Sequence, residues 1–344
     1  MKKDLSTKAI TKCKDVFSDI CNVNLFQSRK QILPEDLEPV GTEVEYRDAN
    51  GELKEHRMDV RMKHRNSNVD IALFCLENQS GISNIMPIRD MGYLYSSYSE
   101  QIREIKEKNR EKGLNFYSRE IGDAQKMIPV ISLILYYGYE DWTGPESVLD
   151  MLDISEEWRP FLGPLIANHQ IRVVHLARQD EETRKMYQSD FRHVVDYLAY
   201  VRQKNKEKLK EFMRDRSRKI IHPQEYLDVM HAFTNDRRYL EIAESIQKNE
   251  EKGEEMNMCI LLDMMEEEGM KRGMQKGMQK GVKKGELFKM IELVMKKLEK
   301  GKKLEEIADA LEESADYISQ ITEAIKKSET KDLQTIYSSL TNKC

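Results

Sequence analysis

Asp59, Glu77 and Gln79 are polar residues that stand beside short apolar segments of this chain. Residues 69–76 are apolar apart from Asp70 and are bounded by polar turn formers, which predicts a buried strand ending just before Glu77. Because side chains alternate along a strand, Glu77 and Gln79 are expected on one face and Asn78 on the other. A buried carboxylate is costly unless it is paired or holds a metal, so two facing acids favour a divalent cation. Ligands that are all oxygen favour magnesium or manganese over zinc.

The same two acids also have an interpretation without a metal. Arg57, Arg61 and Lys63 lie close to Asp59 in the sequence and offer ordinary ion pairs at the strand ends. On residue types alone, a metal centre and a structural ion pair therefore both stay open. Further along, Arg89 and Tyr93 are one helical turn apart, which would let Arg89 contact a phosphate while Tyr93 packs in the core.

Alternating helical and strand patterns predict a mixed α/β sheet that positions these residues. The expected elements are an amphipathic helix over 6–26, a strand and turn over 44–51, a long helix over 86–112, and strands over 128–137 and 171–176. In the long helix, the apolar face is expected to carry Ile88, Met91, Leu94, Tyr95, Tyr98 and Ile102. After about residue 185 the strand signals stop and charged helical segments follow.

The acidic pair resembles the core of the PD-(D/E)XK nucleases, because Asp59 is followed eighteen positions later by Glu77-Asn78-Gln79. More closely, the chain is similar to the Rpn family of recombination-promoting nucleases and transposase-like proteins. The resemblance rests on five ordered segments, namely 16–22 with Leu25-Phe26, the acidic pair, 86–89 with Tyr93, 129–138 and a tail with glycine at every fourth position.

That resemblance implies a PD-(D/E)XK, restriction-endonuclease-like α/β fold and a magnesium-dependent DNA endonuclease, with Mn²⁺ as a substitute ion, that promotes recombination or transposition. Asp59, Glu77 and the backbone carbonyl of Asn78 would hold the ion, and Gln79 would orient the attacking water. Asp19, or else Asp15, would supply a third acid from the first helix, unless that helix face is simply solvated. Lysine is more common in the family where this chain has Gln79, so slower or more metal-dependent cleavage is expected. The alternative is an inactive nuclease fold that binds DNA or assembles oligomers.

Composition gives the protein no marked bias toward nucleic acid, because 61 acidic residues face 56 basic ones. The five cysteines lack paired spacing and the seven histidines show no metal-ligand spacing, so free thiols and no zinc site are expected. No apolar run reaches eighteen residues, and no signal peptide is evident, which predicts a cytoplasmic protein without a membrane span.

Four regions are expected along the chain: a nuclease-like core over 1–185, a helical extension over 186–250, a glycine-repeat segment over 251–303 and a small hairpin over 304–326. The repeat places glycine at 269, 273, 277, 281 and 285, and it fits either a flexible basic spacer or a self-associating helix. The hairpin resembles a helix-turn-helix with Ser314 as the cap of its second helix. Either DNA reading or homo-oligomer assembly would suit it.

Overall fold

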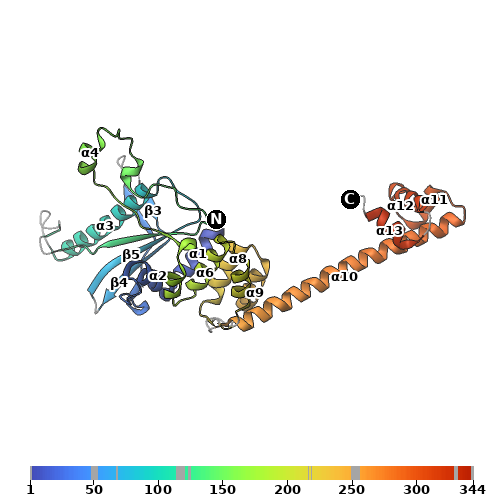
Figure 1. The fold of residues 1–344 in the computed structure, drawn as a ribbon, viewed down its shortest axis with the longest axis horizontal. Helices are drawn as coiled ribbons and strands as arrows, with labels where there is room; N and C mark the ends of the chain where they lie inside the picture. Colours follow the sequence, from blue (N-terminus) through green and yellow to red (C-terminus); the bar gives the residue numbers. More distant parts are fainter. Residues whose placement is uncertain are drawn as a thin grey trace. The chain divides into compact units, whose positions relative to one another are not determined.

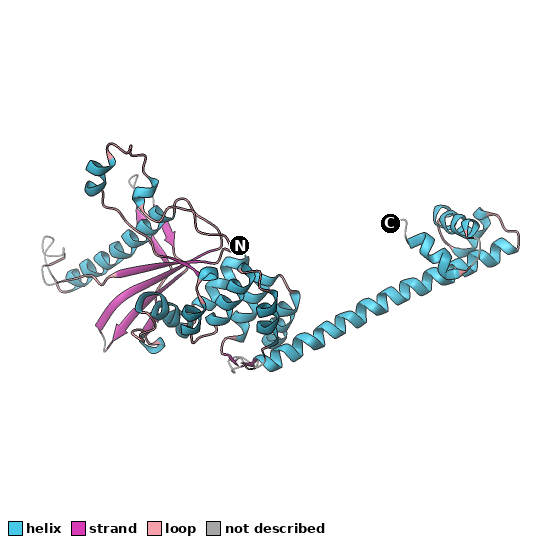
Figure 2. Ribbon diagram, viewed as in Figure 1, coloured by secondary structure: helices cyan, strands magenta, loops and turns pink. Residues whose placement is uncertain are grey.

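The computed structural model describes residues 2–47, 53–66, 69–113, 121–122, 125–215, 217, 219–248, 256–328 and 332–341. The chain forms two compact units, Met1–Met265 and Glu266–Cys344. The first unit is an α/β structure and the second is helical (Figures 1 and 2). This agrees with the predicted fold class of a mixed sheet with helices, followed by a largely helical region.

A five-stranded mixed sheet forms the centre of the first unit, in the order β1-β4-β5-β6-β7. Pairing is antiparallel between β1, β4 and β5 and parallel between β5, β6 and β7. The strands are β1 (Leu37–Pro39), β4 (Val60–Asn66), β5 (Val69–Gln79), β6 (Val130–Tyr136) and β7 (Val173–His175). A separate hairpin, β2 (Glu43–Arg47) with β3 (Leu53–Arg57), precedes β4, and a short pair joins β8 (Lys219–Ile220) to β9 (Met256–Asn257).

Alternation along β5 divides the core into two layers. Ala72, Phe74 and Leu76 pack into the larger hydrophobic cluster, whereas Leu73 and Cys75 pack into a second cluster on the other face. The larger cluster is closed by helices that include α2 (Lys14–Phe26), α6 (Phe191–Arg202) and α8 (Pro223–Thr234), and the second by α3 (Met86–Glu111) (Figure 1). The remaining helices of this unit are α1 (Lys2–Thr11), α4 (Arg159–Leu162), α5 (Glu181–Met186), α7 (Lys206–Arg214) and α9 (Arg237–Lys248), with short 3₁₀ turns at Pro34–Asp36, Val148–Met151, Gly163–Leu165 and Leu176–Arg178.

Two expectations about helices need correction. The helix expected over 6–26 is broken into α1 and α2, because Cys13 adopts an extended conformation as the N-cap of α2. The long helix α3 lies where it was expected, but Ile88, Met91 and Tyr95 are 49%, 39% and 62% exposed. Its buried positions include Asp90 and Tyr93, because the sheet face beneath offers polar partners such as the Ser132 hydroxyl, which donates to Asp90.

The helices over 186–248 pack into the same hydrophobic cluster as the sheet. Phe191, Val195 and Leu198 of α6 are fully buried there, together with Leu227 and Met230 of α8. Burial of this size explains why these charged segments are helical, since tertiary packing supplies most of the stability of a helix in a protein.

The second unit is built around a small core of its own. The long helix α10 (Met258–Glu299) ends in this unit, where α11 (Leu304–Leu311), α12 (Ala315–Lys327) and α13 (Leu333–Thr341) follow. Ile291, Ile307, Ile321 and Ile336 are fully buried in its cluster. The predicted cap is confirmed, because the Ser314 side chain accepts a hydrogen bond from the backbone N–H of Tyr317.

Candidate metal centre

Asp59 and Glu77 are brought together by the antiparallel pairing of β4 and β5. Asp59 lies in the bend directly before β4, and the register pairs Val60 with Leu76, which places Asp59 next to Glu77 across the ladder. The Asp59 carboxylate accepts a hydrogen bond of 2.8 Å from the backbone N–H of Asn78. Its other oxygen lies 3.9 Å from the Lys8 ammonium of α1.

The two oxygens of the buried Glu77 carboxylate differ in their hydrogen bonds. Its Oε1 accepts hydrogen bonds from Arg89 at 2.6 Å, from the Gln79 amide at 3.0 Å and from the Tyr93 hydroxyl at 3.3 Å. Its Oε2 is buried and has no hydrogen-bond partner among the residues that the structure describes. A buried carboxylate oxygen without a donor is costly, and a cation would relieve that cost.

The electrostatics of the pair follow from this burial. Burial and then the negative charge of Asp59 raise the pKa of Glu77 to about 7, against the opposing effect of Arg89. Burial, with the charge of Glu77, also raises the pKa of Tyr93 to about 12, so its hydroxyl stays protonated and can donate. Two carboxylates that disfavour each other's charge are the arrangement that a divalent cation stabilises.

The strand β5 runs to Gln79, past the end predicted before Glu77, and the predicted alternation of side chains over its last three residues is confirmed. The Gln79 side chain turns to Glu77, whereas the Asn78 side chain accepts from the Tyr137 hydroxyl and donates to Thr11 on the opposite face. The expected use of the Asn78 backbone carbonyl as a metal ligand stays a prediction. The Asn78 backbone does contribute to the site, because its N–H fixes Asp59.

Arg89 pairs with Glu77 of the acidic centre. Its guanidinium donates to Glu77 and to the Tyr93 hydroxyl, lies 5.8 Å from the centre of the Tyr93 ring, and leaves 35% of the side chain exposed. Among the partners considered from the sequence, Arg61 pairs instead with Glu100 and Lys63 with Asp70. The side chain of Arg57 lies outside the described residues. The contact of Arg89 with a phosphate remains a prediction.

Asp19 has a different set of contacts. One of its oxygens accepts three hydrogen bonds, from the backbone N–H groups of Gln188 and Ser189 at 2.8 Å each and from the Ser189 hydroxyl at 2.7 Å. These bonds tie α2 to the segment before α6. Burial nevertheless raises the pKa of Asp19 above its usual value. Asp15, the other expected acid, pairs with His222 at 2.7 Å.

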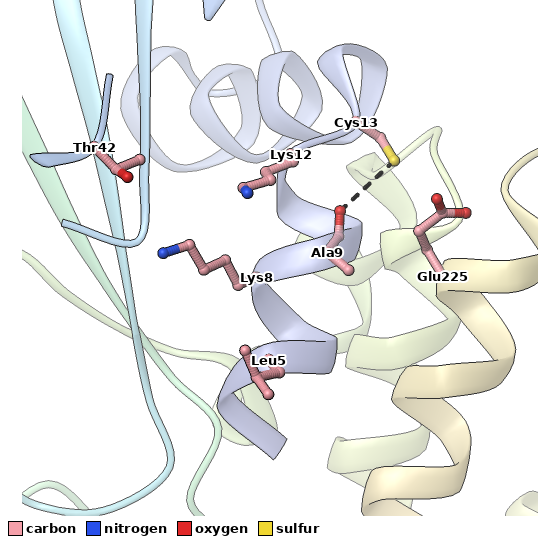
Figure 3. Close-up of a pocket in the computed structure, with 7 residues that line it drawn as sticks. All are labelled: Leu5, Lys8, Ala9, Lys12, Cys13, Thr42 and Glu225. Carbon is pink, nitrogen blue, oxygen red and sulfur yellow. Dashed lines mark hydrogen bonds between the residues drawn. The ribbon is translucent and has the colours of Figure 1, made fainter. Parts of the chain in front are cut away.

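Lys8 and Lys12 are functional candidates that the sequence patterns did not single out. They line an open cavity of about 720 Å³ together with Leu5, Ala9, Cys13, Thr42 and Glu225. Figure 3 shows the two ammonium groups pointing to the same side, away from Cys13 and Glu225. Lys8 lies both in this cavity and near Asp59, and Lys12 follows four residues later, directly after the end of α1. No local sequence pattern identifies these lysines as functional, because their position near Asp59 depends on the packing of α1 against β5.

The residues present fit a hard divalent cation. Two carboxylates from neighbouring segments converge, and one buried oxygen of Glu77 lacks a donor within the described part of the chain. Asp59 and Glu77 are the residues that would hold such an ion.

Searches against protein-family models, curated proteins and solved structures find no match to this chain.

Proposed function

We propose that this protein is a magnesium-dependent DNA endonuclease of the PD-(D/E)XK type, similar to the Rpn recombination-promoting nucleases. The observation that carries the proposal is the convergence of Asp59 and Glu77 with an unpartnered, buried oxygen on Glu77 among the described residues. Mn²⁺ would substitute for Mg²⁺, since both prefer oxygen ligands. Cytoplasmic location is part of this proposal. Among the described residues, no helix has both the length and the apolar run that crossing a bilayer requires.

Each residue of the centre would have a separate part in phosphodiester hydrolysis. Asp59 and Glu77 would hold the ion, which would supply the positive charge that neutralises a scissile phosphate and activates water. The Asn78 N–H and the Tyr93 hydroxyl fix the two carboxylates. Gln79 donates to Glu77 and, as a neutral amide, orients water without adding the positive charge that lysine would supply.

DNA would approach along the basic side of this centre. Lys8 and Lys12 line the adjacent cavity, and the exposed part of Arg89 borders Glu77. Lysine and arginine side chains bind phosphates without reading base sequence, so we expect cleavage with little sequence preference from these contacts.

Nicking of supercoiled plasmid tests the proposal. Wild-type protein with Mg²⁺ is expected to nick, and Asp59→Asn and Glu77→Gln are each expected to reduce the rate by at least about a hundredfold, because each removes a charged ligand. Asp70→Asn is the matched control, since Asp70 lies at the other end of β5 and pairs with Arg65 and Lys63. That variant should cut at the wild-type rate.

Nicking that persists unchanged in both Asp59→Asn and Glu77→Gln would refute the assignment of these residues. Unfolding curves for every variant separate loss of chemistry from loss of fold. A variant that is inactive and still melts at the wild-type temperature supports the assignment.

A second candidate is a non-catalytic protein that keeps this fold and assembles through its C-terminal helices. Two observations favour it: the ion pair of Arg89 with Glu77, and a row of exposed side chains on α10. Met270, Met274, Met278 and Val282 are 76%, 76%, 70% and 52% exposed, each beside a glycine. This candidate predicts a homo-oligomer that neither nicks DNA nor binds magnesium.

A further inference from the structure

Cys13, His222 and Glu225 converge outside the acidic centre, although about two hundred residues separate the first from the other two. One potential ligand atom from each of the three residues lies within 4.8 Å of the others. All three side chains are partly exposed, so an ion can reach them.

Two helix starts bring these residues together. Cys13 is the N-cap of α2, and His222 is the N-cap of α8, with Glu225 three residues later on the first turn of α8. Helix α8 packs against α1, which places the Cys13 thiol beside the start of α8. Figure 3 shows Cys13 and Glu225 facing each other at one end of the cavity.

Asp15 supplies the support that a metal-binding histidine requires. Its carboxylate lies 2.7 Å from His222 Nε2, which leaves Nδ1 as the ring nitrogen available to an ion. Histidine ligands in metal sites usually donate their second ring N–H to a carboxylate, which fixes the ring and makes it a better ligand. Here Asp15 lies in the first turn of α2, two residues after the N-cap Cys13, so the start of one helix provides both the thiol and the orienting carboxylate.

We propose that Cys13, His222 and Glu225 form a binding site for a zinc-type transition-metal ion, with Asp15 as the positioning residue. Sulfur, imidazole nitrogen and carboxylate oxygen are the donor types that Zn²⁺ accepts. Around tetrahedral Zn²⁺ the ligand atoms lie roughly 3.3–3.8 Å apart, so the three groups need to close by at most about 1.5 Å. Rotation of the partly exposed Cys13 and Glu225 side chains can supply this movement.

The site has a fourth position to fill. Cys13 and Glu225 both line the open cavity, so water or a donor atom of a ligand can complete the shell from that side. Lys8 and Lys12 line the same cavity but point away from the thiol, as Figure 3 shows, and so do not compete with the ion. A bound thiolate has lost its proton, so metal uptake at Cys13 is expected to release protons. The bound ion would link α2 to α8.

Cobalt binding to the full-length protein tests this site, because a thiolate bound to Co²⁺ gives a charge-transfer band that oxygen ligands do not give. Metal-stripped wild type is expected to bind one Co²⁺ with this band, and added Zn²⁺ should abolish it by competition. Cys13→Ser should lose the band and keep its fold, because serine is a favourable N-cap. Cys344→Ser is the matched thiol control and should keep the band.

Two further variants separate the roles in the site. Asp15→Asn should retain the band but bind Co²⁺ about 10 to 100 times more weakly, as expected for a residue that orients a ligand. Glu77→Gln should leave the band and the affinity unchanged, since it belongs to the acidic centre. A wild-type protein without the band, or a band that survives in Cys13→Ser, would overturn the proposal.

Discussion

At the scale of single residues, the ionisation of Glu77 links the candidate centre to stability. Its pKa is raised from 4.5 to about 7 by burial and by Asp59. The folded state therefore holds the Glu77 proton more tightly than the unfolded state does. The stabilising contribution is complete below about pH 4.5 and is lost as pH rises through about 7.

Glu77→Gln should remove this pH dependence, because a neutral amide has no charge to bury. In the presence of a chelator, the unfolding free energy of the variant relative to wild type is expected to rise by on the order of 2–3 kcal/mol from pH 5 to pH 8. Urea unfolding at the two pH values measures the difference. If the variant and wild type differed in unfolding free energy by the same amount at pH 5 and at pH 8, the pKa of Glu77 in the folded protein would be close to its ordinary value.

Asp19 is the residue whose predicted role its contacts support least. Asp19→Asn weakens a set of three hydrogen bonds to Gln188 and Ser189, so we expect a loss of roughly 1–2 kcal/mol in unfolding free energy. Nicking with Mg²⁺ should continue at the wild-type rate. If nicking disappeared while stability stayed unchanged, Asp19 would instead be the third acid that the family resemblance implies.

The sequence carried enough information to pair Asp59 with Glu77, because a two-residue period and a short hairpin place both acids at the same end of adjacent strands. The ion-pair partner of Glu77 could not be predicted from the sequence. Arg89 reaches Glu77 because α3 packs with Asp90 and Tyr93 toward the sheet. This face of α3 is polar as well as buried, so the pattern of apolar residues in the sequence does not identify it as the buried face. The Cys13, His222 and Glu225 group depends on contacts between distant helices and has no local pattern.

At the scale of elements, the apolar runs that predicted strands correspond to β5 and β6. Burial is unbroken over residues 72–78 of β5 and 132–136 of β6, whereas Val69 and Ile71 at the start of β5 are 60% and 45% exposed. The run over 171–176 forms a strand only at Val173–His175. The break between α1 and α2 was not predictable, since residues 6–26 contain neither glycine nor proline. Packing of the two helices against different partners fixes that break, with Cys13 in extended conformation.

The glycine repeat is helical within α10, and its glycines have open space where a Cβ would lie. If a second copy packs on this seam, the triple variant Gly273→Ala, Gly277→Ala and Gly281→Ala should lower the solution mass from at least twice 40.5 kDa to that of one chain. Light scattering after size-exclusion chromatography measures the mass.

The same triple variant has a different outcome if α10 stands alone. Each alanine then stabilises the helix by about 1 kcal/mol, and the mass stays that of wild type. A wild-type protein that is already a single chain would contradict self-association. Gly269→Ala and Gly285→Ala change the glycines at the two ends of the repeat, and their solution masses can be compared with that of the triple variant.

At the scale of the whole molecule, the chain consists of two units with separate hydrophobic clusters. The acidic centre and the Cys13 group both lie in the first unit, so both proposals concern that unit. The helical extension over 186–248 shares its core with the sheet, because α6 and α8 cover the face opposite α3. The shared core could not be predicted from the charge-rich sequence of this extension, because apolar residues occupy only one side of each helix.

Calorimetric titration of the full-length protein with Mg²⁺ at pH 8 tests the central claim most directly. The account predicts heat from a saturable site in wild type and in Asp70→Asn, and no such heat in Asp59→Asn or Glu77→Gln. Binding should weaken at pH 6, where a proton occupies Glu77. Mg²⁺ binding that is absent from wild type, or unaltered in the Asp59 and Glu77 variants, would contradict the account.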